Sequence, residues 1–268
     1  SKSEKVELTM IYSAAEKLIA TDSMIEERPF RNPHHSITAA SFIGGSSTGK
    51  PGEISLAHNG VLMLDEFPEF KKHVIESLRE PLEQGNIILS RNQNVFSFPA
   101  NFILIAAMTP CPCGYYPDMV KCQCLPGEIA RYQGKLSGPI LDRIDLHIQM
   151  NPVTYEKMSS MSQEESSADI MERVKKAHRI QAKRYKNEDF KYNSELAAKH
   201  VKEYCRYEPA AEVLLEEAYK TLGLSSRSYH RLLKVSRTIA DLAGKELIEA
   251  AHVAEAIMFR SSFEHNMM

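Results

Sequence analysis

A short apolar segment that ends in two acidic residues places the strongest constraint on how this chain folds. Residues 61–64 are all apolar, follow Gly60, and precede Asp65, Glu66 and, two positions later, Pro68. Such a run is typical of a central strand buried in a parallel sheet. Because open α/β sheets bind their ligands beyond the carboxyl ends of the strands, we expect Asp65 and Glu66 to lie at a binding site.

The two carboxylates suit the hydrolysis of a nucleoside triphosphate. Asp65 is placed to hold Mg²⁺ through water, and Glu66 to polarise the attacking water molecule. This is the Walker B pattern of ATP-hydrolysing motors. Apolar strands that end in acids are common, however, so the interpretation depends on the rest of the sequence.

Length and composition describe an ordinary globular protein. The 268 residues suffice for one large or two small domains, and a formal net charge of −2 gives no overall attraction to nucleic acid. No apolar run is long enough to predict a membrane span. Residues 1–5 lack the apolar core of a signal peptide, so we expect a cytoplasmic protein.

Hydrophobic periodicity and turn residues divide the chain into an α/β part, residues 1–152, and an all-helical part, residues 153–268. In the first part we expect helices at 6–19, 52–58 and 70–84, a hairpin with strands 87–89 and 95–98, a loop at 28–50, and strands at 61–64, 102–108 and 146–150. In the second part we expect a linker at 155–168 and helices at 169–185, 194–204, 209–222, 226–243 and 248–259.

Several segments, in order, support the Walker B interpretation. They are residues 31–35, 52–66, 111–114 and 137–145 in the first part, and 224–231 and 236–242 in the second. Together they resemble the magnesium-chelatase-like AAA+ ATPases of the ComM/YifB type, from about residue 5 to about residue 260. The resemblance implies a partial AAA+ parallel-sheet core with a helical lid, ATP and Mg²⁺ as cofactors, hydrolysis between the subunits of a homo-oligomeric ring, and DNA as a partner, with branch migration in recombination or transformation.

The phosphate-binding loop of such an ATPase is missing. Residues 44–50 match a P-loop until Pro51 occupies the position of the Mg²⁺-binding hydroxyl, and only fourteen residues separate Lys50 from Asp65. We therefore expect a flexible loop at 44–50. The resemblance implies that the true P-loop precedes the first helix, so we expect this chain by itself not to hydrolyse ATP.

Further site residues follow from the resemblance. Thr109 ends the strand beside the acidic one, at the sensor position, where the family usually has Asn; the alternative is a Thr-Pro turn. Arg143 matches an arginine finger that reaches a neighbouring subunit, or else it pairs with Asp142 or Asp145.

In the helical part, Arg227 matches the lid sensor, with Arg231 one turn later as the alternative. Ser225 or Ser226 is expected to cap the helix on which they lie. Both arginines could instead belong to a solvated helix face.

Four clustered cysteines form a candidate metal site. Cys111, Cys113, Cys122 and Cys124 could supply four thiolates to one tetrahedral zinc ion, although C-x-C is rarer than the usual C-x₂-C. The alternatives are reduced loop cysteines or a disulfide. Cys205, alone on a helix, is expected in the core.

Contacts to DNA are predicted less specifically. Arg91, at the tip of the hairpin, either contacts a phosphate backbone or belongs to a polar turn. The basic stretch 173–186 is either a nucleic-acid contact or a solvated helix face, and His34 and His35 are expected at the surface. The alternative function is a non-catalytic chaperone or metal-insertion module related to magnesium chelatase subunits.

Overall fold

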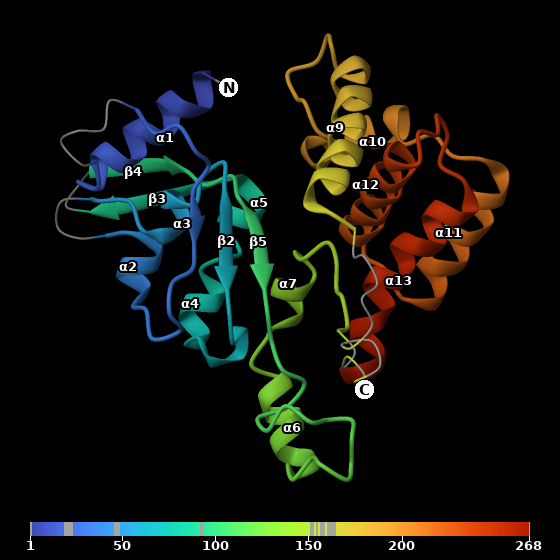
Figure 1. Ribbon diagram of the computed structural model, residues 1–268, viewed down its shortest axis with the longest axis horizontal. Helices are drawn as coiled ribbons and strands as arrows, with labels where there is room; N and C mark the ends of the chain where they lie inside the picture. Colours follow the sequence, from blue (N-terminus) through green and yellow to red (C-terminus); the bar gives the residue numbers. More distant parts are fainter. Residues whose placement is uncertain are drawn as a thin grey trace. The chain divides into compact units, whose positions relative to one another are not determined.

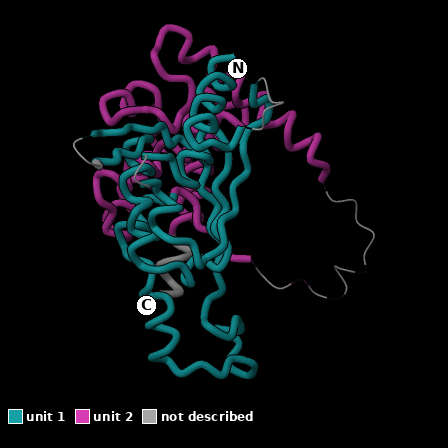
Figure 2. The backbone as a smooth tube through the Cα atoms, turned by 90° about the vertical axis from the view of Figure 1, so that its left-hand side faces the viewer, with its two compact units in different colours: residues 1–144 teal, residues 145–268 magenta. Residues whose placement is uncertain are grey.

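A computed structural model describes residues 2–18, 24–45, 49–91, 94–150, 153, 155, 159 and 165–267. The chain forms two compact units, residues 1–144 and residues 145–268, shown in different colours in Figure 2. The domain boundary predicted after residue 152 stays a prediction. None of the helices in the described part of the chain is long and apolar enough to cross a membrane.

The first unit is built on a parallel three-stranded sheet. Its strands are β1 (Phe30–Arg31), β2 (Val61–Leu64) and β5 (Ile103–Ala106), in the spatial order β1-β2-β5. Leu64 pairs with Ala106, so β2 and β5 end at the same edge, and their arrows run side by side in Figure 1. The prediction of an α/β fold with a parallel sheet is confirmed.

The third strand of the sheet is not the predicted one. Residues 146–150 form no strand, and Leu146, Ile148 and Met150 are all largely exposed. The backbone N–H of His147 donates instead to the carbonyl of Phe259, at 2.7 Å. The alternation of apolar and polar residues at 146–150 therefore did not indicate a strand with one buried face. The actual third strand, β1, has only two residues, too few to produce a periodic pattern.

Helices flank the sheet, and all of them except α1 contribute residues to one hydrophobic core. They are α1 (Lys2–Ala14), α2 (Ala39–Ile43), α3 (Glu53–Leu56), the 3₁₀ helix η1 (Phe67–Glu69), α4 (Lys72–Glu76) and α5 (Pro81–Gln84). The single helix predicted at 70–84 is divided into η1, α4 and α5. Pro81 begins α5, and because proline lacks an N–H it cannot continue a helix from the preceding turn.

The predicted hairpin is confirmed. β3 (Asn86–Arg91) pairs antiparallel with β4 (Asn94–Pro99), and Arg91 lies opposite Asn94. The tip, residues 92–93, lies outside the described residues. Gly85 ends α5 in the left-handed conformation, with φ 69°, which glycine adopts without steric cost.

Two helices follow β5 within the first unit: α6 (Pro126–Gln133) and α7 (Gly138–Leu141). In Figure 1, α6 and the loop before it extend past the carboxyl ends of β2 and β5. This segment therefore borders the edge of the sheet at which the active site is expected.

The described residues of the second unit form helices and no named strand, as predicted. It contains α9 (Ser167–Arg184), the 3₁₀ helix η2 (Asn193–Glu195), α10 (Ala198–Tyr204), α11 (Pro209–Thr221), α12 (Ser226–Leu242) and α13 (Ala250–Met267). Most of the linker predicted at 155–168 falls outside the described residues. Cys205 is buried in the core of this unit, as expected.

A buried ionic network lies inside the helical unit. The carboxylate of Asp241 is fully buried and accepts hydrogen bonds from the guanidinium groups of Arg184, at 2.8 Å, and Arg237, at 3.2 Å. The amide of Asn193 donates to it at 2.9 Å. Because both arginines converge on one anion, α9 and the carboxyl-terminal half of α12 are held together by charge as well as by apolar packing.

Candidate active site

The predicted acidic pair leaves the sheet directly after β2. Asp65 follows Leu64, and Glu66 adopts the left-handed conformation, with φ 52° and ψ 45°. The N–H of Glu66 donates to Asp65 Oδ1 at 2.9 Å, and the N–H of the buried Phe67 donates to the carbonyl of Ala107 at 2.9 Å. A residue with a side chain rarely adopts this backbone conformation, so its surroundings must hold Glu66 there.

Glu66 has a partner that the sequence did not reveal. His35 Nδ1 lies 2.9 Å from Glu66 Oε2, and the His35 ring packs edge-on against Phe70, 6.4 Å between centroids. Both polar groups reach solvent, so they remain accessible to a ligand. His35 follows β1, the short strand that the sequence analysis did not predict, and recognising that strand would have placed the histidine at the edge of the sheet that carries Glu66.

Thr109 follows the neighbouring strand β5 at the same edge of the sheet. Its hydroxyl donates to the carbonyl of Cys111 at 3.0 Å and lies 3.0 Å from the hydroxyl of Tyr132 on α6. Because a threonine hydroxyl has only one hydrogen, Tyr132 must be the donor to Thr109. The side chain of Gln133 also donates to the carbonyl of Pro110, at 2.9 Å, so α6 fixes the chain as it leaves β5.

The two ends of the segment that resembles a P-loop are bridged to each other. Gly44 and Pro51 form an isolated antiparallel bridge, and Lys50 forms an ion pair with Glu16. Residues 46–48 lie outside the described residues. Lys50 faces a carboxylate and α3 begins only at Glu53, so no helix starts at the described residues Gly49 and Lys50, where a phosphate-binding loop would lead into one.

Arg143 follows α7 and is largely covered. Its guanidinium forms an ion pair with Glu83 on α5 and donates to the carbonyl of Pro139 at 2.6 Å. The Arg143 side chain is 11% exposed and that of Glu83 is 40% exposed. An ion pair was one of the two interpretations of this residue, but Glu83 lies sixty positions away in sequence and was not among the partners considered.

The two candidate lid residues lie on the first two turns of α12. The side chain of Ser225 caps this helix by accepting the N–H of Ser228, at 3.1 Å. Arg227 is exposed, whereas Arg231 is mostly covered and donates to Asp145 Oδ1 at 2.9 Å. Of the two residues, Arg227 is therefore the more exposed.

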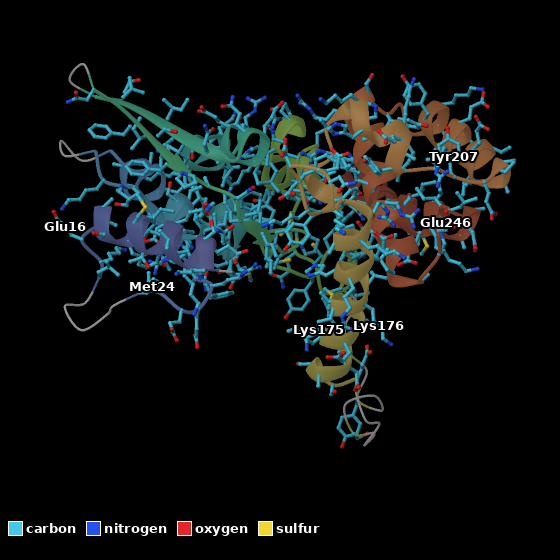
Figure 3. All side chains as sticks on the ribbon, turned by 90° about the horizontal axis from the view of Figure 1, so that it is seen from above. Glu16, Met24, Lys175, Lys176, Tyr207 and Glu246 are labelled. Atoms are coloured by element: carbon cyan, nitrogen blue, oxygen red, sulfur yellow. The ribbon has the colours of Figure 1, made fainter. Side chains whose placement is uncertain are left out.

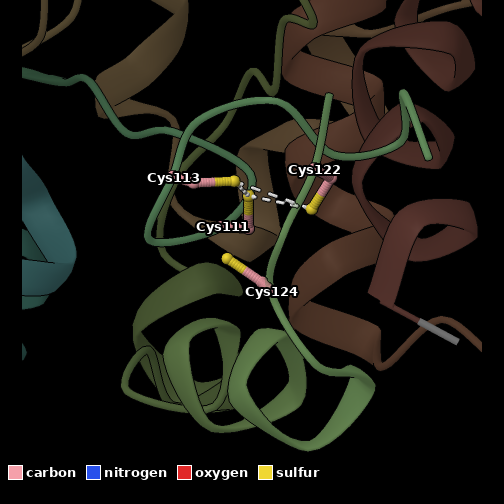
Figure 4. Close-up of side chains that lie close together, drawn as sticks. All are labelled: Cys111, Cys113, Cys122 and Cys124. Carbon is pink, nitrogen blue, oxygen red and sulfur yellow. Dashed lines mark hydrogen bonds between the residues drawn. The ribbon is translucent and has the colours of Figure 1, made fainter. Parts of the chain in front are cut away.

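The four clustered cysteines converge in the loop between β5 and α6 (Figure 4). Their sulfur atoms all lie within 4.8 Å of one another. Backbone N–H groups of Tyr115 and Gln123 donate to the thiol of Cys113 and lower its pKa to about 6. One thiol of the cluster is therefore held in an environment that favours the charged form.

The candidate DNA contacts are only partly described. Arg91 is the last residue of β3, and its side chain lies outside the described residues. In the basic stretch, Lys175 and Lys176 lie on α9 (Figure 3), and Lys175 pairs with Glu172 at 2.8 Å. Arg184 donates a hydrogen bond to the buried carboxylate of Asp241 and so belongs to the ionic network described above. The stretch is thus less basic towards solvent than its sequence suggests.

The arrangement as a whole defines a class of protein. A parallel sheet whose neighbouring strands exit into an acidic pair and a hydroxyl, followed by a helical unit, is consistent with the AAA+ fold. Comparison with protein families places the chain within this class. Residues 1–158 match the model of magnesium chelatase, subunit ChlI, and residues 164–260 match that of the ChlI C-terminal region. The chain belongs to this magnesium chelatase family, as the resemblance to its ComM/YifB members implied.

Individual relatives agree with this assignment. The chain is 45% identical to Competence protein ComM of Haemophilus influenzae over 237 residues, which cover 88% of this chain and 46% of the relative. It is 43% identical over 238 residues to the uncharacterized protein YifB of Salmonella typhimurium, again covering 88% of this chain and 46% of the relative. It is 39% identical over 263 residues to an uncharacterized protein of Mycobacterium bovis, and this match covers 98% of this chain and 52% of the relative. The chain thus spans about half the length of these relatives.

Proposed function

We propose that this chain supplies the Walker B acids, the sensor, the arginine finger and the lid of an ATP-hydrolysing motor that works as a homo-oligomeric ring on DNA. The observation that carries the proposal is the pair of adjacent parallel strands, β2 and β5, whose exits bear Asp65, Glu66 and Thr109. Membership of an AAA+-type ATPase family supports it.

The acidic pair fits Mg²⁺, because Asp65 and Glu66 offer exposed carboxylate oxygens, the ligand type that this hard cation prefers. Bound Mg²⁺ would neutralise charge on the ATP phosphates. Glu66, fixed by its left-handed backbone and by His35, would orient the attacking water and polarise it. Thr109, held between Cys111 and Tyr132, would present its hydroxyl as the sensor at the same edge.

Residues outside the sheet would complete the site in the assembled ring. Arg143 would reach the nucleotide of a neighbouring subunit and stabilise the charge that develops during phosphoryl transfer. Arg227 would contact the nucleotide from the lid, and Arg231 is the alternative. We propose that phosphate binding depends on a P-loop elsewhere in the full-length protein, because Pro51 and the Lys50–Glu16 pair disqualify residues 44–50.

An ATPase assay on the full-length protein tests this proposal. Glu66→Gln should reduce steady-state turnover by roughly 10²-fold or more while leaving ATP binding intact, because the substitution removes a group that acts on the attacking water. Glu69→Gln is the matched control: this carboxylate lies three positions along and forms an exposed pair with Lys135, at 3.0 Å. Equal turnover in wild type and Glu66→Gln would refute the assignment.

The DNA-directed part of the proposal rests on similarity to a competence protein and on the polar hairpin that carries Arg91. Salt-sensitive binding to branched DNA that weakens in Arg91→Ala would support it. The alternative is a non-catalytic chaperone or metal-insertion module, as the family's magnesium chelatase model suggests. Binding to a partner protein without affinity for DNA would favour that alternative.

A further inference from the structure

The loop between β5 and α6 holds four thiols at the spacing of a single metal ion. The Sγ atoms are separated by 3.4 Å between Cys111 and Cys113, 3.9 Å between Cys111 and Cys122, and 3.6 Å between Cys113 and Cys122. The sulfur of Cys124 completes the cluster, within 4.8 Å of the others (Figure 4). All four cysteines are free.

These separations match zinc coordination. Four sulfur ligands about 2.3 Å from zinc, at the corners of a tetrahedron, lie about 3.8 Å from one another. A disulfide would need a pair of sulfur atoms to close to about 2.0 Å, far less than any of these three separations. A cluster of several irons binds cysteines on different metal atoms and therefore spreads them further apart. We propose that Cys111, Cys113, Cys122 and Cys124 bind one structural zinc ion.

The loop has no regular secondary structure and little apolar packing to order it. Residues 107–125, all of which the structure describes, contain no helix or strand, and Cys111 alone among them is buried. Met119, Val120 and Leu125 are 71%, 95% and 67% exposed, so they provide no apolar anchor. Loops of this length without regular structure are uncommon in compact domains. A metal ion would supply the missing cross-link.

Backbone turns bring the two cysteine pairs together. The N–H of Gly114, whose φ of 83° favours glycine, donates to the carbonyl of Cys111 at 3.0 Å. The N–H of Cys122 donates to the carbonyl of Asp118 at 2.8 Å. The N–H of Tyr116 also donates to Cys111 Sγ, at 3.4 Å. Such N–H donors to ligand sulfur orient thiolates and offset the negative charge of a tetrathiolate site.

The zinc would also secure the end of β5. The carbonyl of Cys111 accepts the hydroxyl of Thr109, so the first ligand of the site is one hydrogen bond from the proposed sensor. The metal would act as a clip that holds this strand exit and the exposed turn at 115–121, with no part in the chemistry of hydrolysis. The inference does not depend on the proposed ATPase function.

Elemental analysis of the full-length protein, purified without chelator, provides the test. We expect about one zinc per chain, falling towards zero in Cys122→Ser and remaining at about one in Cys205→Ala, the matched control whose cysteine lies in the helical core. Replacement of zinc by Co²⁺ should give the visible absorption of a tetrahedral thiolate site.

A second measurement covers the case in which the cysteine variant fails to fold. Chelation of zinc from wild-type protein should increase hydrogen exchange within residues 107–125 while leaving α11 and α12 protected. Protein that is free of metal with an ordered loop, zinc retained in a folded Cys122→Ser variant, or iron in place of zinc would each overturn the proposal. None of these outcomes would by itself refute the proposed ATPase function.

Discussion

Arg143 offers the sharpest test of how the proposed site works, because the structure gives it a partner within the same chain. As an arginine finger it would act on a neighbouring subunit's nucleotide, whereas as a structural residue it would act through its ion pair with Glu83. Substituting each partner separately distinguishes the two roles. Arg143→Ala removes both functions, whereas Glu83→Gln removes the ion pair and leaves the guanidinium in place.

The expected magnitudes differ widely. The carboxylate of Glu83 is 40% exposed, so the pair is screened by water and its loss should cost at most about 1 kcal/mol. Such a loss corresponds to roughly a fivefold change in an equilibrium or a rate. Removal of an arginine finger costs roughly 10³-fold or more in turnover. In the full-length protein we therefore expect Arg143→Ala to abolish most ATPase activity and Glu83→Gln to retain most of it.

Steady-state turnover, nucleotide binding and thermal stability should be measured on both variants. Nucleotide affinity should change little in Arg143→Ala, because a finger acts on charge that develops in the transition state. Rings mixed from Arg143→Ala and Glu66→Gln subunits should recover some activity, because some interfaces then hold one intact copy of each residue. A loss in Glu83→Gln as large as that in Arg143→Ala would refute the finger role and assign Arg143 to the ion pair.

Two further predictions concern stability. Asp241→Ala should lower the free energy of unfolding of the helical unit by roughly 3–5 kcal/mol, since it leaves Arg184 and Arg237 without their shared buried anion; a fall of less than 1 kcal/mol in urea denaturation would contradict this. Glu53 should stabilise the fold at neutral pH. Burial raises the pKa of its carboxyl group, but Arg31 Nε, 2.6 Å from Glu53 Oε2, outweighs burial and keeps this pKa below its usual value. That stability should disappear as pH falls below about 4.5 through the folded-state pKa. The urea midpoint of Glu53→Gln should therefore depend less on pH in this range.

The elements that were predicted correctly are those whose sequence pattern lies within or directly beside the element itself. Residues 61–64 are a continuous apolar run with punctuating residues on both sides, and the hairpin at 86–99 alternates around a polar tip. Helix α12 buries residues that recur along one face, and a capping serine lies directly before its first turn. In each case the residues that define the element lie within the element.

The strands that were mispredicted depend on pairing with another segment of the chain. β1 is recognisable as a strand only because Arg31 pairs with Leu62, and no pattern within two residues could show it. Residues 146–150 have the alternation of a strand but form none, and their apolar side chains are exposed. Periodicity therefore identified segments able to form strands, and sheet pairing decided which of them did.

The candidate site shows the same contrast: the sequence placed the site residues but did not identify their contact partners. The sequence placed Asp65, Glu66 and Thr109 at strand ends, because position along an element follows from pattern, but it could not identify His35 or Glu83 as partners. For Arg143 it considered the nearest acids, Asp142 and Asp145, although Asp145 pairs with Arg231 and Arg143 pairs with Glu83. An arginine in a turn after a short helix chooses its partner from whatever element packs beside that turn. Proximity in sequence carries little information about that choice, and Glu83→Gln is therefore the substitution that tests Arg143.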